Sequence, residues 1–329
     1  MATIVITDIA WPSPAIETGL ARGAGHDILL AESDEHLLSL APRADAFLTC
    51  FRRVPAEVLD AADRCLTVAR YGVGVDNIDV ARATDLGILV SNVPEFCTEE
   101  VADHTLALAL AALRNLLPAT DATRAGGWTP DAPFPTRRLR GLVFGVLGFG
   151  ATGRAVAERA AAFGFEVVVE SRALAADPGA APASVARVVD RDELLRLADV
   201  VSLHVPLNAD TRHLVGAREL GMMKDGALLI NVARGGLVDT EALRPELEGG
   251  RLRAALDVTE PEPLPSDHWL RSAPAAIVTP HVAFASDGSL VELATKATSN
   301  ALAVLAGRRP PTIVNPEVLA SDLLRAIPQ

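Results

Sequence analysis

The sequence has little lysine and little cysteine. Among its 329 residues only Lys224 and Lys296 are lysines, so nearly all positive charge is arginine, which we attribute to genome composition and not to function. The three cysteines, Cys50, Cys65 and Cys97, are odd in number and widely spaced. That pattern predicts neither a disulfide framework nor a zinc or other metal site, and it favours reduced thiols in the cytoplasm.

Long apolar runs and an excess of positive charge are also missing. The stretch 105–113 is too short to cross a bilayer, and residues 1–9 lack the basic start of a secretion signal, so no membrane association is expected. The formal net charge of −12 provides no basic face for nucleic acid. An anionic ligand would have to be captured by local arginines and backbone amides.

What the sequence does contain is typical of a large α/β protein. Half of its residues are hydrophobic and 22% are charged, and 329 residues suffice for two domains. Strand-like apolar runs alternate with helical patterns, which indicates parallel βαβ architecture. We expect strands at 3–7, 46–49, 67–70 and 89–91, a second series at 143–147, 166–170, 200–204, 227–231, 253–257 and 276–279, and a last helix over 287–307.

A long helix is expected over 98–125, broken near Pro118 and stopped by glycines at 126–127. Thr98 is its predicted N-cap because two acidic residues follow it in the first turn. The alanine-rich stretch 173–186 contains prolines and a glycine, which predicts a loop or a frayed helix.

A glycine-rich motif follows the strand at 143–147 directly. Gly148, Gly150 and Gly153 form a GxGxxG pattern that leads into a helical run. The first glycine permits a tight turn, the second lets the backbone approach a pyrophosphate, and the third lets helix and strand pack closely. Free amides at the helix start favour phosphate. The alternative is a glycine-rich turn without a ligand, which the strand–turn–helix context disfavours, so the motif predicts a dinucleotide-binding Rossmann domain.

The choice of nicotinamide cofactor stays open at the end of the next strand. Glu170 could bind the ribose hydroxyls and favour NAD. Alternatively, Ser171 and Arg172 could hold a 2′-phosphate and favour NADP.

Further short motifs stand in a fixed order along the chain: Tyr71-Gly-Val-Gly-Val-Asp-Asn-Ile-Asp79, Asn92-Val-Pro94, Glu99-Glu-Val-Ala-Asp103, His204-Val-Pro-Leu207, Asn231-Val-Ala-Arg-Gly-Gly-Leu-Val-Asp239, Ala255-Leu-Asp-Val258, Glu262-Pro263 and Thr279-Pro-His281. With these motifs the chain resembles the D-isomer-specific 2-hydroxyacid dehydrogenases over nearly its whole length. Within them it looks closest to the branch that includes the C-terminal-binding-protein corepressors.

The resemblance implies three catalytic residues. Arg234 occupies the Asn-x-x-Arg-Gly segment, and His281 follows Thr-Pro. The acid of the family lies five residues after the aspartate of Asp-Val and precedes a proline, which selects Glu262, with Glu260 as the alternative two residues away.

The resemblance also implies the binding residues. Backbone amides around Val73 and Gly74 are expected to hold the substrate carboxylate. Asp257 matches the position that contacts the nicotinamide carboxamide. The expected cofactor site, for NAD or NADP, comprises Gly148, Gly150, Ala151, Thr152, Gly153, Glu170, Ser171, Arg172, His204, Ala233 and Asp257. Two positions depart from the family pattern: Ala151 replaces a common arginine, and Ser171 replaces the usual ribose-binding aspartate.

The implied chemistry suits these residue types. Reduction of a 2-oxo acid needs a hydride, which the cofactor supplies, and a proton at the carbonyl oxygen. Histidine titrates near neutral pH, so His281 suits the proton transfer, and a carboxylate such as Glu262 on its other ring nitrogen would orient the ring and favour its protonated form. Arg234 can make paired hydrogen bonds to the substrate carboxylate and polarise the carbonyl.

Other charged residues have weaker signals. Arg52 or Arg53 could recognise a second anionic group on the substrate, although a solvated pair on a loop explains them equally well. His204 ends a strand, which favours packing beside the cofactor over catalysis. His104 lies within the long helix and is expected to make an interhelical or interface contact.

The family resemblance also predicts the domain organisation. Residues 1–97 and 287–329 would form the substrate domain, and 98–286 the inserted cofactor domain, through which a homodimer would form. Two alternatives to a hydroxyacid dehydrogenase stay open: a nucleotide-sensing binding protein, as in the corepressor relatives, and a dehydrogenase of phosphite or a phosphonate.

Overall fold

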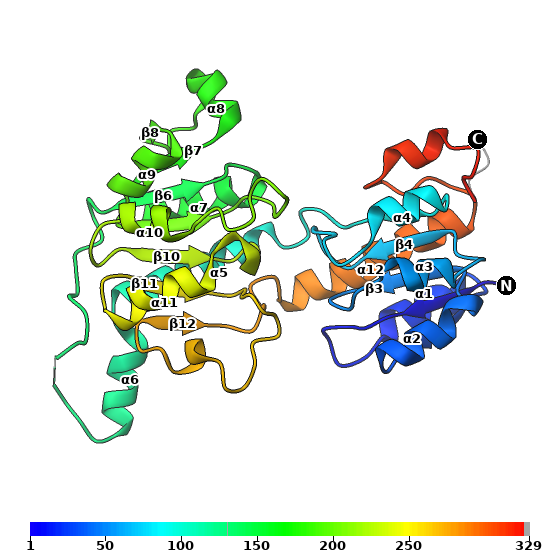
Figure 1. Cartoon of the computed structure of the whole chain (residues 1–329), viewed down its shortest axis with the longest axis horizontal. Coiled ribbons are helices and arrows are strands. Elements are labelled where there is room, and N and C mark those ends of the chain that lie inside the picture. Colours follow the sequence, from blue (N-terminus) through cyan, green and yellow to red (C-terminus); the bar gives the residue numbers. More distant parts are fainter. Residues whose placement is uncertain (130, 326–329) are drawn as a thin grey trace. The chain divides into compact units, whose positions relative to one another are not determined.

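Two parallel sheets form the framework of the computed structural model, which describes residues 1–129 and 131–325 (Figure 1). One compact unit comprises Met1–Phe96 with the segment from Ser286 onward, and the other comprises Cys97–Ala285. The predicted α/β class, with two Rossmann-like domains built on parallel sheets, is confirmed. The domain boundaries expected from the sequence each lie one residue from the limits of these units.

The first unit is built on a five-stranded sheet of order β2-β1-β3-β4-β5 within the described chain. Apolar side chains on one face, such as Val5, Phe47 and Val68, pack against α2, α3 and α4, whereas α12 packs on β3 and β4 beside α1. Its elements are β1 (Thr3–Ile6), α1 (Ala15–Gly23), β2 (Asp27–Leu30), α2 (Asp34–Leu40), η1 (Ala41–Arg43), β3 (Ala46–Thr49), α3 (Ala56–Asp60), β4 (Thr67–Arg70), α4 (Val80–Asp85), β5 (Leu89–Ser91), α12 (Asp287–Leu305) and η5 (Pro316–Ala320).

The second unit has a seven-stranded sheet of order β12-β11-β10-β9-β6-β7-β8 in the described part of the chain. Helices α5 and α7 cover one face, and α9, α10 and α11 cover the other, so the strands are apolar on both sides. Its elements are α5 (Thr98–Leu113), α6 (Leu116–Arg124), β6 (Val143–Leu147), α7 (Ala151–Ala162), β7 (Glu166–Glu170), α8 (Arg172–Ala176), η2 (Pro178–Ala180), β8 (Arg187–Val188), α9 (Arg191–Leu197), β9 (Val200–Leu203), α10 (Ala217–Met222), β10 (Leu228–Asn231), η3 (Gly235–Leu237), α11 (Thr240–Glu248), β11 (Arg253–Leu256), η4 (Trp269–Ser272) and β12 (Ala276–Val278).

The expected long helix is two helices, and the break lies at Asn115, close to the predicted Pro118 but not caused by it. The chain turns at Asn115, whose φ is 50°, and Pro118 lies in the first turn of α6, where no intrahelical amide donor is required. The Asn115 side chain donates to the carbonyl of Phe134 at 2.9 Å, and this tertiary contact stabilises the break. The predicted N-cap is wrong by one residue, because Cys97 occupies it and makes no side-chain cap bond.

Helix α6 projects away from the sheet of its unit (Figure 1) and has no buried residue. Leu116 and Leu117 on it are 57% and 47% exposed, and Trp128 just beyond it is 89% exposed. None of the helices in the described ranges is both long enough and apolar enough to span a bilayer.

Candidate active site

The glycine loop lies at the point where the strand order of the second sheet reverses, between β6 and β9. Gly148 has a φ of 95°, and a Cβ atom there would lie 2.6 Å from the carbonyl oxygen of His204. A Cβ atom at Gly153 would lie 2.3 Å from the carbonyl oxygen of Gly148. Gly150 has no heavy atom within 4 Å of its Cβ position, which leaves space for a ligand. The three glycines therefore differ in the way that a dinucleotide-binding turn requires.

Helix α7 begins immediately after this turn, with Gly150 as its N-cap. The amides of Ala151 and Thr152 belong to its first turn, where backbone N–H groups have no acceptor within the helix. Such amides, together with the helix dipole, suit the phosphates of a dinucleotide.

A cavity of about 430 Å³ extends beyond the ends of β6 and β7. Of the three residues expected near the adenosine ribose, Glu170 and Arg172 line this cavity and Ser171 does not. The Ser171 hydroxyl instead accepts the amide of Leu174 at 3.4 Å and caps α8.

Arg191 also lines this cavity and was missed from the sequence. It is the first residue of α9, after the two-residue strand β8, which is too short to give a recognisable pattern. Within the described residues neither Arg172 nor Arg191 forms an ion pair.

The acids around the cavity differ in what they bind. Asp190 caps α9 through an amide at 2.8 Å. Asp192 forms an ion pair with Arg218. Glu170 and Asp210 form no ion pair in the described part of the chain, so two carboxylates and two guanidinium groups are available to a ligand here.

His204 lies at the end of β9 beside the glycine loop. Burial lowers its pKa from 6.5 to about 4, so the ring is neutral at neutral pH. Its Nε2 lies 2.8 Å from the hydroxyl of Ser202. The geometry accords with packing beside a cofactor.

His281 and Glu262 form a hydrogen-bonded pair in the same unit. The distance from His281 Nδ1 to Glu262 Oε1 is 2.5 Å, and the side chains are 20% and 36% exposed. His281 has a φ of 53°, an uncommon conformation for a residue other than glycine. Phe284 meets the ring edge to face at 6.0 Å.

The alternative acid, Glu260, faces a different partner set. Its carboxylate pairs with Arg212 at 2.8 Å and with His213 at 2.9 Å. Of the two acids, Glu262 is the one that contacts His281. The geometry therefore supports the choice of Glu262, which rested on its position five residues after Asp257.

Arg234 lies in a turn that Asn231 shapes from both sides. The Asn231 side chain donates to the carbonyl of Arg234 at 2.8 Å and accepts the amide of Ala233 at 3.1 Å. A Cβ atom on the next residue, Gly235, would lie 2.0 Å from the carbonyl oxygen of Thr259. This close approach brings the Arg234 turn next to the loop that carries Glu262.

Asp257 is buried, with its side chain 0% exposed, and it holds the segment that follows Thr279. Its carboxylate accepts the amides of Val282 and Ala283 at 3.0 and 2.9 Å. His104, expected to make an interhelical or interface contact, has its ring 3.1 Å from Thr279, beside this carboxylate.

In the first unit, residues 72–74 form a turn after β4. Gly72 has a φ of 139°, and the carbonyl of Val73 accepts the Asn92 side chain at 2.7 Å. The side chain of Val73 is 50% exposed. These contacts tie two of the motifs, 71–79 and 92–94, to each other.

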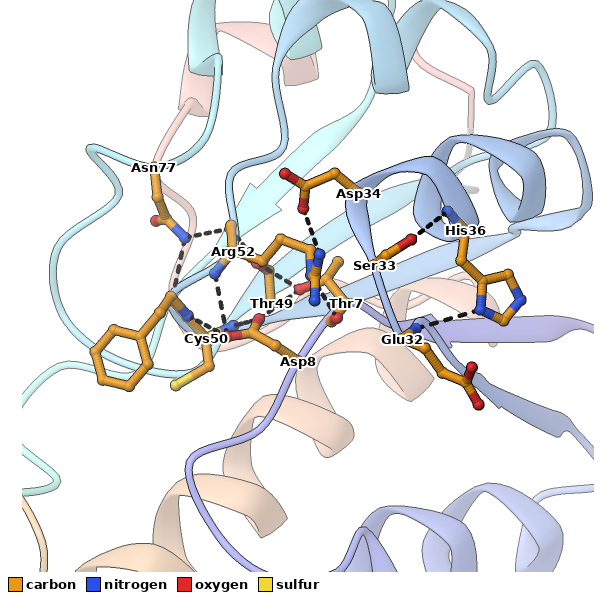
Figure 2. Close-up of polar contacts among 11 residues, drawn as sticks. Thr7, Asp8, Glu32, Ser33, Asp34, His36, Thr49, Cys50, Arg52 and Asn77 are labelled. Carbon is orange, nitrogen blue, oxygen red and sulfur yellow. Dashed lines mark hydrogen bonds and ion pairs between the residues drawn. The ribbon is translucent and has the colours of Figure 1, made fainter. Parts of the chain in front are cut away.

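The loop 50–52 after β3 is held by one carboxylate, that of Asp8 after β1 (Figure 2). Its oxygens accept the amides of Cys50, Phe51 and Arg52 at 2.9, 2.7 and 3.1 Å. Asn77, from the 71–79 motif, donates to two carbonyls of the same loop at 3.1 and 2.9 Å.

The guanidinium of Arg52 is engaged within its own unit. Its Nε donates to the carbonyl of Thr7 at 2.9 Å, and its Nη1 pairs with Asp34 (Figure 2). Arg53 is exposed and forms no ion pair within the described residues.

No cluster of three or more metal-ligating side chains is found in residues 1–129 and 131–325. Comparison with known proteins decides the family. Residues 106–283 match the family model described as D-isomer specific 2-hydroxyacid dehydrogenase, NAD binding domain. A glyoxylate reductase of Aeropyrum pernix is 41% identical over 298 residues, which is 87% of either chain. The chain belongs to the D-isomer specific 2-hydroxyacid dehydrogenase family.

Solved structures agree with this assignment. The D-lactate dehydrogenase of Aquifex aeolicus in complex with NAD and lactic acid is 26% identical, with a TM-score of 0.81 over 94% of this chain and 98% of that one. An NADPH-dependent glyoxylate/hydroxypyruvate reductase from Sinorhizobium meliloti is 29% identical, with a TM-score of 0.81 over 95% and 98%. The chain is therefore a nicotinamide-dependent oxidoreductase of 2-oxo and 2-hydroxy acids that uses NAD or NADP.

Proposed function

We propose that this dehydrogenase reduces glyoxylate or a similarly small 2-oxo acid, with His281, Glu262 and Arg234 as its catalytic residues. The 2.5 Å pair between His281 and Glu262 carries the proposal, since it presents an oriented imidazole for proton transfer. The glyoxylate reductase of Aeropyrum pernix supports the choice of substrate.

The reduced cofactor supplies the hydride, and the residues of the chain supply orientation, charge and the proton. The amides of α7 and the glycine loop would hold the pyrophosphate. Arg234 would bind the substrate carboxylate and polarise the carbonyl. Because Nδ1 of His281 faces Glu262, the ring delivers its proton to the carbonyl oxygen from Nε2. In the oxidative direction the same nitrogen accepts the proton.

The test follows absorbance of the reduced nicotinamide with glyoxylate, hydroxypyruvate, pyruvate and phosphite, the last with oxidised cofactor. We expect turnover of glyoxylate and its loss in His281→Ala. Turnover of phosphite alone would assign a different substrate class. Cofactor binding without turnover of any acid would favour a nucleotide-sensing binding protein, the alternative suggested by the resemblance to the C-terminal-binding-protein branch.

The cofactor is proposed to be NADP(H). Arg172 and Arg191 both line the adenosine-side cavity without an ion pair in the described structure, and two guanidinium groups complement a 2′-phosphate. Glu170 at the same cavity would favour NAD instead. We expect Arg172→Ala to raise the KM for NADPH about tenfold or more and to leave that for NADH nearly unchanged. A wild-type preference for NADH that Glu170→Gln abolishes would contradict the proposal.

A second anionic group on the substrate is proposed to contact Arg53. The engagement of Arg52 with Thr7 and Asp34 favours a structural role for that residue. Arg53→Ala should raise the KM for dicarboxylic or phosphorylated 2-oxo acids and leave that for glyoxylate unchanged. If Arg53→Ala leaves the KM values for dicarboxylic and phosphorylated 2-oxo acids unchanged, the proposal is contradicted.

The chain is also proposed to be a homodimer formed through the cofactor domain. The exposed apolar residues Leu116, Leu117 and Trp128 on and beside α6 support a contact there. Sedimentation should give a dimer that Trp128→Arg weakens, and a monomeric wild type would refute it. A cytoplasmic location is proposed because Cys50 and Cys65 are buried and form no disulfide in the described structure.

A further inference from the structure

A chain of hydrogen bonds connects helix α5 with the segment that carries His281. Nε2 of His104 on α5 lies 3.1 Å from the hydroxyl oxygen of Thr279. That hydroxyl donates to Oδ1 of Asp257 at 2.6 Å. All of these residues belong to the same compact unit, Cys97–Ala285.

The direction of these bonds follows from proton count. A threonine hydroxyl has one proton, and the short bond to the Asp257 carboxylate uses it because an ionised carboxylate only accepts. The Thr279 oxygen must therefore accept from His104, which places a proton on Nε2 of that ring.

Asp257 transmits this arrangement to His281. Its backbone carbonyl accepts the amide of His281 at 2.7 Å, and its carboxylate accepts the next two amides, of Val282 and Ala283. These three bonds hold the residue whose φ is 53°. A non-glycine residue in that region costs about 1 kcal/mol or more, so the surrounding bonds are needed to keep the ring in place.

The charges around Asp257 give further support to a contact with His104. The side chain of Asp257 is 0% exposed, and its hydrogen-bond donors are a hydroxyl and two amides, all neutral. Among the described residues, His104 is the one group able to carry positive charge within 4.0 Å of that carboxylate, at 3.6 Å. The ring thus faces a carboxylate that has no arginine or lysine partner in the described structure.

We propose that His104 is a positioning residue for the reaction: its Nε2–H orients Thr279 and Asp257, and through them the 281–283 segment that presents the imidazole of His281. The inference rests on the proposed role of His281. His104 does not itself contact the reacting atoms.

The test compares variants that remove or restore one donor. His104→Leu fills the space of the ring without a donor, His104→Gln places an amide N–H near the position of Nε2, and Thr279→Val removes the hydroxyl while keeping the branch. We expect kcat to fall about tenfold in His104→Leu and in Thr279→Val. His104→Gln should return to within about threefold of wild type. The double variant, which combines His104→Leu with Thr279→Val, should be no slower than either single variant.

A readout independent of turnover accompanies the kinetics. Hydrogen exchange of the amides of His281, Val282 and Ala283 should accelerate in His104→Leu and not in His104→Gln, because their acceptor loses its orientation. Wild-type turnover and its loss in His281→Ala are measured first. If these fail, the proposed function fails, and the exchange data still decide whether His104 positions the segment.

Three results would overturn the inference. One is a kcat of His104→Leu within about twofold of wild type. Another is an equal loss in His104→Gln, which would assign the effect to ring packing. The third is a double variant whose losses multiply, which would show that His104 and Thr279 act independently. Thermal unfolding identifies any variant that does not fold, and Thr279→Val with His104→Gln then provide the test.

Discussion

Glu262 lies against the imidazole of His281, and Glu260, two residues earlier, lies against His213 instead. One short loop therefore presents two carboxylates to two different histidines. The pair makes a matched comparison possible, because the same chemical change can be made on either side of one proline.

We expect Glu262→Gln to lower kcat for 2-oxo acid reduction about 100-fold, since the amide neither orients nor stabilises the protonated ring as a carboxylate does. Glu260→Gln should keep kcat near wild type, because its partners Arg212 and His213 lie outside the proposed chemistry. Steady-state assays of both variants check this. Equal losses would mean that the loop, and not the contact with His281, controls turnover.

The glycine loop offers a second matched pair. Gly153→Ala should destabilise the cofactor domain by about 1–3 kcal/mol, because its Cβ atom would lie 2.3 Å from a backbone oxygen. Gly150→Ala should unfold like wild type, because nothing lies within 4 Å of the added atom. Its cofactor affinity should nevertheless fall about tenfold or more, since the methyl group occupies the approach to the pyrophosphate. Denaturation and nucleotide-fluorescence titrations measure the two effects, and wild-type affinity in Gly150→Ala would place the pyrophosphate elsewhere.

The neutral His204 makes stability depend on pH. Its pKa is about 4 in the folded chain, and near 6.5 when unfolded, so between these values the unfolded chain binds a proton that the folded chain does not. Stability contributed by this residue is therefore complete above pH 6.5 and declines as the pH falls toward 4. The loss between pH 7 and 5 should be up to about 2 kcal/mol smaller in His204→Gln. Urea titrations check the difference, and the two proteins should run parallel between pH 7 and 8. Parallel curves down to pH 5 would show that the ring titrates normally.

Asp8 is expected to matter more for the first unit than its neighbour Asp34. Asp8→Ala leaves three amides of the loop 50–52 without their acceptor and should lower the free energy of unfolding by about 3 kcal/mol. Asp34→Ala removes one ion pair of an acid that is 85% exposed and should cost less than about 1 kcal/mol. Chemical denaturation compares the two, and equal effects would refute this account of the loop.

Patterns that repeat along the sequence predicted most of the fold. Short or irregular elements could not be predicted from them. Strands such as 143–147 and 166–170 are buried on both faces, so their apolar runs are unambiguous. Strand β2 was not predicted because it is a half-exposed edge of four residues, and β8 because it has only two. The break at Asn115 depends on a bond to Phe134, a contact distant in sequence that no local pattern contains.

In the candidate site, too, some contacts could be predicted from the sequence and others could not. The family motifs predicted the contact between Glu262 and His281, since each lies at a fixed place beside a proline. They did not predict the contact of His104 with Thr279, which lie 175 positions apart on a helix and a strand end. Nor did they predict Arg191 at the cofactor cavity, because nothing near it in the sequence distinguishes it from other surface arginines.

The first sheet has the order β2-β1-β3-β4-β5, so its topological switch point lies between β1 and β3, where related open sheets take up ligands. Here the converging amides at that point already surround a carboxylate, and it belongs to Asp8 (Figure 2). The chain thus carries an anion of its own, covalently tethered, in the place where this topology usually admits one from solution. The amides of Cys50, Phe51 and Arg52 are therefore already satisfied from within the chain, and they are not free to bind a carboxylate that arrives from solution.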